Sequence, residues 1–181
     1  MSETARLKAI GVVRILFGIV WAIDAQFKWR PDFFLNFVSY LQGAQEGQPA
    51  LVRQWIDLWI NVVNIDPLAF AYVVAVSETF LALALILGLF SDLAYAGGIL
   101  LCLVIWSTAE GLGGPYVAGS TDIGTAIIYA FVFALLFLTR SGLYLGLDRY
   151  FAPRLGKLSW LGSFGVMRTI TASRSSQRSS A

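Results

Sequence analysis

Four long apolar runs, separated by shorter polar stretches, constrain the fold of this chain more than any other feature. A helix needs about 20 mostly apolar residues to cross the hydrocarbon core of a bilayer, and these runs reach or approach that length. Because lipid offers no hydrogen bonds to the backbone, apolar spans of this length are expected to be helical. We predict an all-α integral membrane four-helix bundle with spans at about residues 9–27, 68–90, 93–109 and 122–139.

The composition agrees with a lipid environment and excludes several kinds of site. Hydrophobic residues make up 57% of the chain and charged residues 13%, with a mean hydropathy of +0.71; a soluble domain carries about 25% charged residues. The chain has no histidine and one cysteine, Cys102, so histidine-ligated haem or zinc sites and internal disulfides are excluded. We predict no metal and no intrinsic cofactor, which leaves a quinone-type carrier, a partner subunit or an uncommon site for any redox role. Cys102 is expected to be a small packing residue.

The segment between the first two runs, residues 30–66, has its own pattern. Within "ALVRQWIDLWINVV", Trp55, Trp59, Val62 and Val63 recur at helical spacing. This pattern predicts an amphipathic interfacial helical segment with its tryptophans at the level of the lipid headgroups. An ordinary helix packed on the bundle is an equally good interpretation.

The distribution of basic residues predicts the topology. Arg6 and Lys8 precede the first span, and further basic residues follow the fourth. Four spans place both ends on one side, which the positive-inside rule makes the cytoplasm. We therefore predict a transmembrane domain over 1–148 and a basic cytoplasmic tail over 149–181 with a disordered end, in the cytoplasmic membrane of a bacterium or archaeon.

Ionisable residues inside the spans are expensive in lipid and therefore point to function. Arg14 and Glu78 are the deepest basic and acidic residues, so we expect them to face each other in the bundle. Their pairing would be either a buried ion pair that fixes the packing or a proton or ligand site. Asp24 lies four residues before Lys28, a spacing that lets the two side chains pair on one helix.

A second group of polar residues is predicted at the outer end of the bundle. The topology places Asp24, Lys28, Glu110 and Asp122 at the same end, around a cavity that Trp106 should also contact. For Asp122 alone, capping of the fourth helix is the simpler interpretation. The candidate proton relay is Glu78, Glu110 and Asp122, and the candidate ligand-binding residues are Arg14, Trp21, Asp24, Lys28, Trp106 and Tyr116.

Three stretches of the sequence resemble a known family. They are "RILFGIVWAIDAQFKWRPDFF" (14–34), "ETFLALALILGLF" (78–90) and "IWSTAEGLGGPYVAGSTDIGTAIIY" (105–129). Each is similar to DoxD-type proteins within the broader DoxX group. The resemblance implies a four-helix membrane fold and a link to thiosulfate:quinone oxidoreductase, a membrane enzyme that couples thiosulfate oxidation to quinone reduction. That enzyme pairs the DoxD subunit with a second subunit, DoxA, and no separate DoxA-like domain follows in this sequence.

Two functions of different classes remain open at this point. One is a redox membrane subunit that binds quinone near the outer face, together with a small sulfur anion. The alternative is a non-catalytic accessory or scaffolding subunit of a larger membrane complex. Both predict the lipid bilayer and other membrane protein subunits as partners, and neither involves nucleic acid. Whether the chain is itself an enzyme is left open by the sequence.

Overall fold

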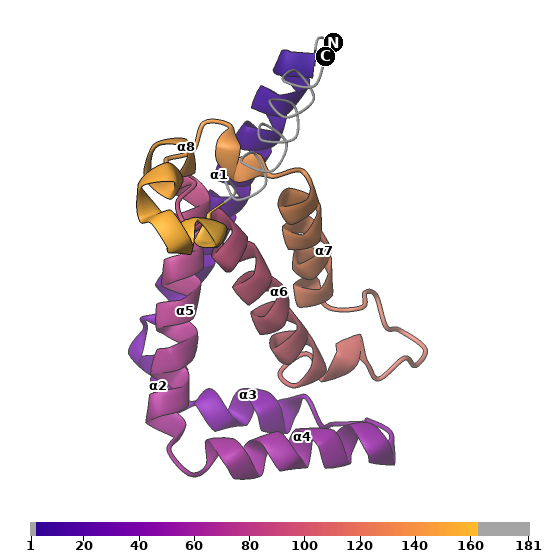
Figure 1. The fold of residues 1–181 in the computed structure, drawn as a ribbon. Helices are drawn as coiled ribbons and strands as arrows, with labels where there is room; N and C mark the ends of the chain where they lie inside the picture. Colours follow the sequence, from indigo (N-terminus) through magenta and orange to yellow (C-terminus); the bar gives the residue numbers. More distant parts are fainter. Residues whose placement is uncertain (1–2, 163–181) are drawn as a thin grey trace, which may run out of the picture.

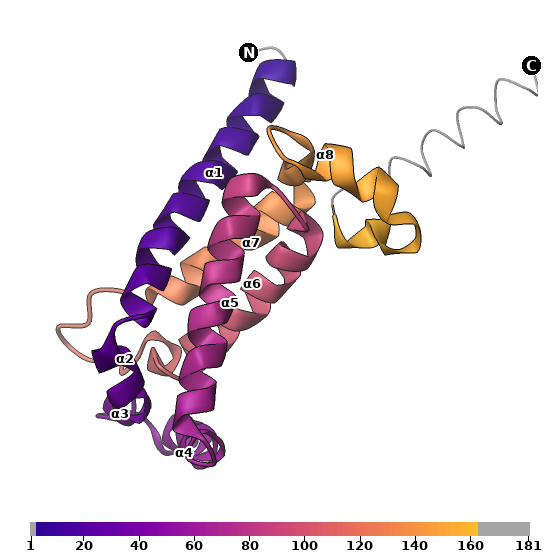
Figure 2. The same cartoon turned by 90° about the vertical axis from the view of Figure 1, so that its left-hand side faces the viewer.

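Four long helices form the body of the protein. The computed structural model describes residues 3–162, and every regular element in this range is helical, which confirms the all-α prediction. The long helices run side by side with alternating direction (Figures 1 and 2), and they are α1 (Glu3–Lys28), α5 (Pro67–Leu87), α6 (Ser91–Ser107) and α7 (Thr125–Leu138). The start of α1 and the short helix α8 lie at one end of the bundle, and α2, α3 and α4 lie at the other.

Helix α5 begins and ends at residues that the sequence marks as helix boundaries. The Asp66 carboxylate accepts a hydrogen bond from the backbone N–H of Ala69 at 3.0 Å, and Pro67 occupies the first helical position. Gly88 ends the helix in the left-handed conformation at φ +61°. Among the described helices, α5 is the one whose length and composition suffice to cross a membrane; α6 and α7 are apolar but have 17 and 14 residues.

Helix α7 begins later than the apolar pattern predicted. The predicted span started at residue 122, but Asp122 and Gly124 form a turn in which the Asp122 carboxylate accepts from the Gly124 N–H at 2.9 Å. Gly124 has a φ of +89°, a conformation that ends any continuous helix there. The 14 residues of α7 rise only about 21 Å.

Three further helices close the lower end of the bundle as drawn in Figure 1: α2 (Pro31–Leu35), α3 (Phe37–Gly43) and α4 (Ala50–Val63). We call them the cap. The prediction that this segment is folded and helical is therefore confirmed. Its apolar core combines side chains of all three helices with the first turns of α5, namely Phe33, Phe37, Leu41, Ile56, Ile60, Val63 and Ala71.

The packed face of helix α4 overlaps the predicted stripe only in part: Val63 is buried in the core of the cap, but the contact is centred on Ile56 and Ile60. Ile56 is fully buried and Ile60 nearly so, whereas Trp55 is 43% exposed. Trp59 is half-buried, with its ring 6.0 Å from that of Trp55 in an edge-to-face arrangement. The isoleucines therefore hold α4 against its neighbours, and the two tryptophans lie beside that contact.

The segment after α7 folds back onto the opposite end of the bundle. It contains η2 (Ser141–Leu143), α8 (Asp148–Phe151) and η3 (Ala152–Leu161). The buried Asp148 carboxylate accepts hydrogen bonds from the backbone N–H groups of Phe90 at 2.8 Å and Ser91 at 3.0 Å. This carboxylate caps the start of α6 from a distant part of the chain. The predicted disordered end of the tail lies outside the described residues.

An aromatic cluster joins α1 to α7 in the middle of the bundle. The Phe17 ring lies 5.3 Å from Tyr129 and 5.0 Å from Phe133, and the Trp21 ring lies 5.8 Å and 5.5 Å from the same two rings. These separations are typical of favourable aromatic pairs. The cluster fills the bundle between α1 and α7.

Candidate functional site

A cavity of about 820 Å³ lies between the ends of the long helices and the cap. All four long helices contribute to its wall, and the cap helices complete it. Of the nine residues predicted as proton relay or ligand-binding residues, five line this cavity, and they are Trp21, Asp24, Lys28, Glu78 and Glu110.

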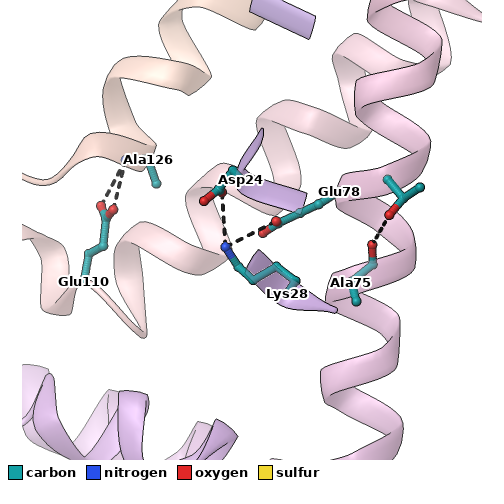
Figure 3. Close-up of polar contacts among 7 residues, drawn as sticks. Asp24, Lys28, Ala75, Glu78, Glu110 and Ala126 are labelled. Carbon is teal, nitrogen blue, oxygen red and sulfur yellow. Dashed lines mark hydrogen bonds and ion pairs between the residues drawn. The ribbon is translucent and has the colours of Figure 1, made fainter. Parts of the chain in front are cut away.

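Three charged side chains form the polar centre of the cavity wall (Figure 3). The Lys28 Nζ atom lies 3.1 Å from an Asp24 oxygen and 3.3 Å from a Glu78 oxygen. The exposed fraction of these side chains falls from 42% for Asp24 to 20% for Lys28 and 1% for Glu78. The lysine thus connects an accessible carboxylate to a buried one. Apart from this ion pair, neither Glu78 oxygen has a hydrogen-bond partner among the described residues.

The predicted pairing of Arg14 with Glu78 is wrong, because α1 and α5 are antiparallel and offset. Helix α1 ends at Lys28, level with the middle of α5. The first eleven residues of α5, which precede Glu78 and span about 16 Å, lie beyond the end of α1 and reach into the cap. Arg14 precedes Lys28 by fourteen residues, so it lies about 21 Å away along α1. Glu78 is therefore paired with the lysine that ends α1.

Arg14 instead holds the turn that follows α7. Its side chain is fully buried and donates hydrogen bonds to the carbonyl oxygens of Ser141 at 3.3 Å and Leu145 at 2.9 Å. The guanidinium packs against Gly88, where an added Cβ would collide with it. Arg14 does not line the cavity, so its predicted role in binding the same ligand is not supported by its position.

Glu110 both lines the cavity and caps α7. Its two carboxylate oxygens accept the backbone N–H of Ala126 at 3.2 and 3.0 Å (Figure 3). Negative charge at this position is favourable because the N-terminus of a helix carries a partial positive charge. The cap predicted for Asp122 is therefore supplied by Glu110 from the turn that follows α6, and Asp122 is exposed.

Asp122, Trp106 and Tyr116 do not line the cavity, which corrects part of the predicted cluster. The Trp106 indole donates to the carbonyl oxygen of Ile123 at 2.7 Å and so fixes the end of the loop before α7. Tyr116 is 66% exposed, and its hydroxyl donates to the carbonyl oxygen of Leu112 at 2.6 Å. Both aromatic residues stabilise the connection that contains η1 (Gly111–Gly113).

The rest of the cavity wall is mainly aromatic and apolar, and part of it comes from the cap. Phe33, Phe37 and Trp59 line the cavity, although the sequence assigned none of them to a site. The helical spacing of Trp59 marked it as an interfacial residue, but nothing local to the sequence shows that α4 folds under the bundle. The indole nitrogens of Trp21 and Trp59 are buried and have no hydrogen-bond partner among the described residues.

The charges around the cavity are unequal. Four carboxylates line it, from Asp24, Asp32, Glu78 and Glu110, against the two cations Lys28 and Arg30. Within residues 3–162, no group of three or more histidine, cysteine, aspartate or glutamate side chains is placed to hold a metal ion. The cavity therefore offers hydrogen-bond donors, a buried carboxylate and aromatic surface, with a net negative lining.

No family model, curated protein or solved structure matches this chain.

Proposed function

We propose that the chain is a membrane-embedded subunit of the DoxD type and that the cavity beside Lys28 and Glu78 binds a quinone. One observation carries the proposal: an aromatic cavity of about 820 Å³ is lined by two tryptophans whose buried indole N–H groups lack acceptors within residues 3–162, and by a buried ion pair with spare hydrogen-bonding capacity. Ligand cavities have volumes of about 300–1,000 Å³, with mostly apolar walls and a few polar groups that orient the ligand.

The outer surface of the long helices is apolar, which supports the proposed location in a lipid bilayer. Large apolar side chains are exposed there, including Leu16, Ile19, Ile23, Val73, Val76, Leu83, Leu100, Phe131 and Leu135. In contrast, Arg14 and Glu78 are fully or almost fully buried. Ionisable groups inside and apolar groups outside are the pattern expected of a bundle in a bilayer. Helices α6 and α7 would cross it with the help of the turns that flank them, because they are shorter than a hydrocarbon core of about 30 Å.

The chemistry of a quinone fits the groups around the cavity. A quinone supplies an electron acceptor with a flat ring and two carbonyl oxygens, and it carries no charge. The indole N–H groups of Trp21 and Trp59 and the ammonium group of Lys28 are donors suited to carbonyl oxygens. The neighbouring rings of Phe33 and Phe37 provide apolar contact surface for the ring of such a ligand.

Each charged residue has a role in this proposal. Lys28 orients the ligand, and the Glu78 carboxylate, ion-paired with Lys28 in the absence of ligand, takes up the proton that it passes to the ligand. Asp24, the more accessible of the two carboxylates, exchanges that proton with the outside through Lys28. Glu110 caps a helix with both oxygens, so it is a weaker candidate for a proton carrier than the sequence suggested. The four lining carboxylates disfavour a sulfur anion in the same cavity.

The proposal is tested by purifying the protein in lipid nanodiscs and measuring the quinone that it retains and its affinity for added quinone. Trp59→Phe removes one unpaired donor, and we expect its affinity for a short-chain quinone to fall about 2- to 13-fold, the worth of one hydrogen bond. Trp55→Phe is the matched control, because Trp55 lies one turn earlier on α4 and does not line the cavity. Absence of bound quinone from the wild-type protein, or equal affinities for the two variants, would contradict the proposal.

A further inference from the structure

Part of the cavity wall is also part of the outer surface of the bundle. Val20, Ile23 and Phe27 of α1 line the cavity, and their exposed fractions are 42%, 54% and 43%. Thr125, the first residue of α7, also lines the cavity and is exposed. A residue that is exposed and lines a cavity marks a place where that cavity is open, so these four residues mark an opening on the side of the bundle. The exposed lining residues Arg30, Asp32 and Tyr40 mark a second, polar opening beside the cap, and Val104 of α6 is also exposed.

The side opening lies on the side of α1 that is adjacent to α7. At 100° per residue, Phe17 and Trp21 point toward α7, as their contacts with Tyr129 and Phe133 show. Around the axis of α1, the face that packs on α5 is followed by the face of Phe17 and Trp21 and then by the face of Val20 and Phe27. These last two residues therefore lie on the far side of the α7 contact from α5. The aromatic cluster bounds the opening toward η2, and the first turn of α7 bounds it on the other helix.

The polarity of the cavity changes toward this opening. The deepest charged group is Glu78 at 1% exposure, next to Lys28. The rim on α1 consists of valine, isoleucine and phenylalanine side chains together with one carboxylate, Asp24, whose side chain is 42% exposed. Apolar side chains do not attract a water-soluble ligand, but they match an alkyl or isoprenoid chain. The rim is also continuous with the exposed apolar surface of α1 formed by Val12, Val13, Leu16 and Ile19.

We infer that the cavity opens sideways into the bilayer between α1 and α7, and that its ligand has an apolar tail lying in this opening. The inference rests on the proposed membrane location and ligand site, and it specifies the ligand class as an amphipath whose head lies at Lys28 and Glu78. The tail leaves past Val20, Ile23 and Phe27 and remains among the lipid chains.

Photo-crosslinking in nanodiscs tests the path of the tail. The probes are a decyl benzoquinone with a diazirine near the end of its alkyl chain and a hexadecanol with the same diazirine. We expect adducts on residues 20–27 of α1 and on the first turn of α7. Adducts confined to α5 and α6, or to the loops, would overturn the inference. Labelling of the opening by the alcohol without binding of the quinone would support the opening and refute the proposed quinone site.

A pair of variants on α1 gives an independent test. Ile23→Trp places a larger side chain in the opening, and we expect at least a fivefold loss of affinity for the tailed quinone with little change for a quinone without a tail. Leu16→Trp is the matched control, because Leu16 is 56% exposed on the same helix but does not line the cavity. Equal losses for both quinones in Ile23→Trp, or equal losses in the two variants, would overturn the inference.

Discussion

The ion pair between Lys28 and Glu78 allows a quantitative test of the site. The Lys28→Met variant leaves the Glu78 carboxylate, which is 1% exposed, without its ionic partner. The Glu78→Gln variant is a milder change, because Lys28 keeps Asp24 at 3.1 Å and its own side chain is 20% exposed. We therefore expect Lys28→Met to be the more destabilising of the two single variants.

The expected magnitudes follow from the burial of each group. Breaking a buried ion pair from one side costs about 3–5 kcal/mol of the free energy of unfolding, whereas replacing both partners by apolar residues is often neutral. Glu78→Gln should cost about 1–2 kcal/mol, and the double variant Lys28→Met/Glu78→Met should unfold close to the wild type. For a chain of this length, the loss in Lys28→Met corresponds to about 6–20 °C in Tm.

Thermal unfolding in nanodiscs, followed by near-UV circular dichroism at one scan rate, measures these differences. Lys8→Met is the matched control, since it makes the same change at an exposed position on the same helix. A Tm for Lys28→Met equal to that of Lys8→Met would show that the ion pair contributes nothing. A double variant as unstable as Lys28→Met would refute the argument that the cost comes from an unpaired buried carboxylate.

Three further predictions test the capping interactions and the close packing at the ends of the helices. Asp148→Ala should lower the free energy of unfolding by about 1–3 kcal/mol, measured by thermal unfolding, because it removes the acceptor of two backbone N–H groups at the start of α6. Glu110→Gln should cost about 1 kcal/mol, because its charge interacts with the N-terminus of α7, whereas Asp122→Asn at an exposed turn should change stability by less than about 0.5 kcal/mol. Gly88→Ala should destabilise the protein by more than about 1 kcal/mol, because Gly88 has a φ of +61° and lies against Arg14, while Gly97→Ala, with nothing within 4 Å of the added Cβ, should be neutral or stabilising. Equal stability of the two glycine variants would contradict the described packing.

The sequence predicted the features that depend on local pattern. Each apolar run became a long helix, because a run of that length favours a helix wherever it is placed. The boundaries of α5 were visible in Asp66 and Pro67, and the pairing of Asp24 with Lys28 followed from their spacing. These predictions required no knowledge of how the helices are arranged.

The features that depend on the axial offset between neighbouring helices are not predictable from the sequence. Arg14 and Glu78 were paired because each is the deepest ionisable residue of its run, but depth within a run does not fix the register between two helices. The sequence assigns the cap of α7 to the nearest acidic residue, Asp122, although the carboxylate that caps this helix comes from Glu110 in the turn after α6. Tertiary contacts of this kind leave little trace in a single sequence.

The offset between α1 and α5 connects the fold to the proposed site. Helix α1 ends at Lys28, whereas the N-terminal half of α5 extends about 16 Å past that end. Within the described range, no long helix therefore packs against this half of α5 on the side where α1 stops. The cap helices cover the end of the space left there without filling it, which leaves the cavity. The chain places around this space a buried carboxylate, a lysine and two indole donors that have no acceptor in the part of the chain the structure describes. Buried polar groups without partners cost stability. Among residues 3–162, Arg14 Nε also lacks a partner away from the cavity, but the two indole donors and the Glu78 carboxylate share one cavity wall, which favours a ligand there.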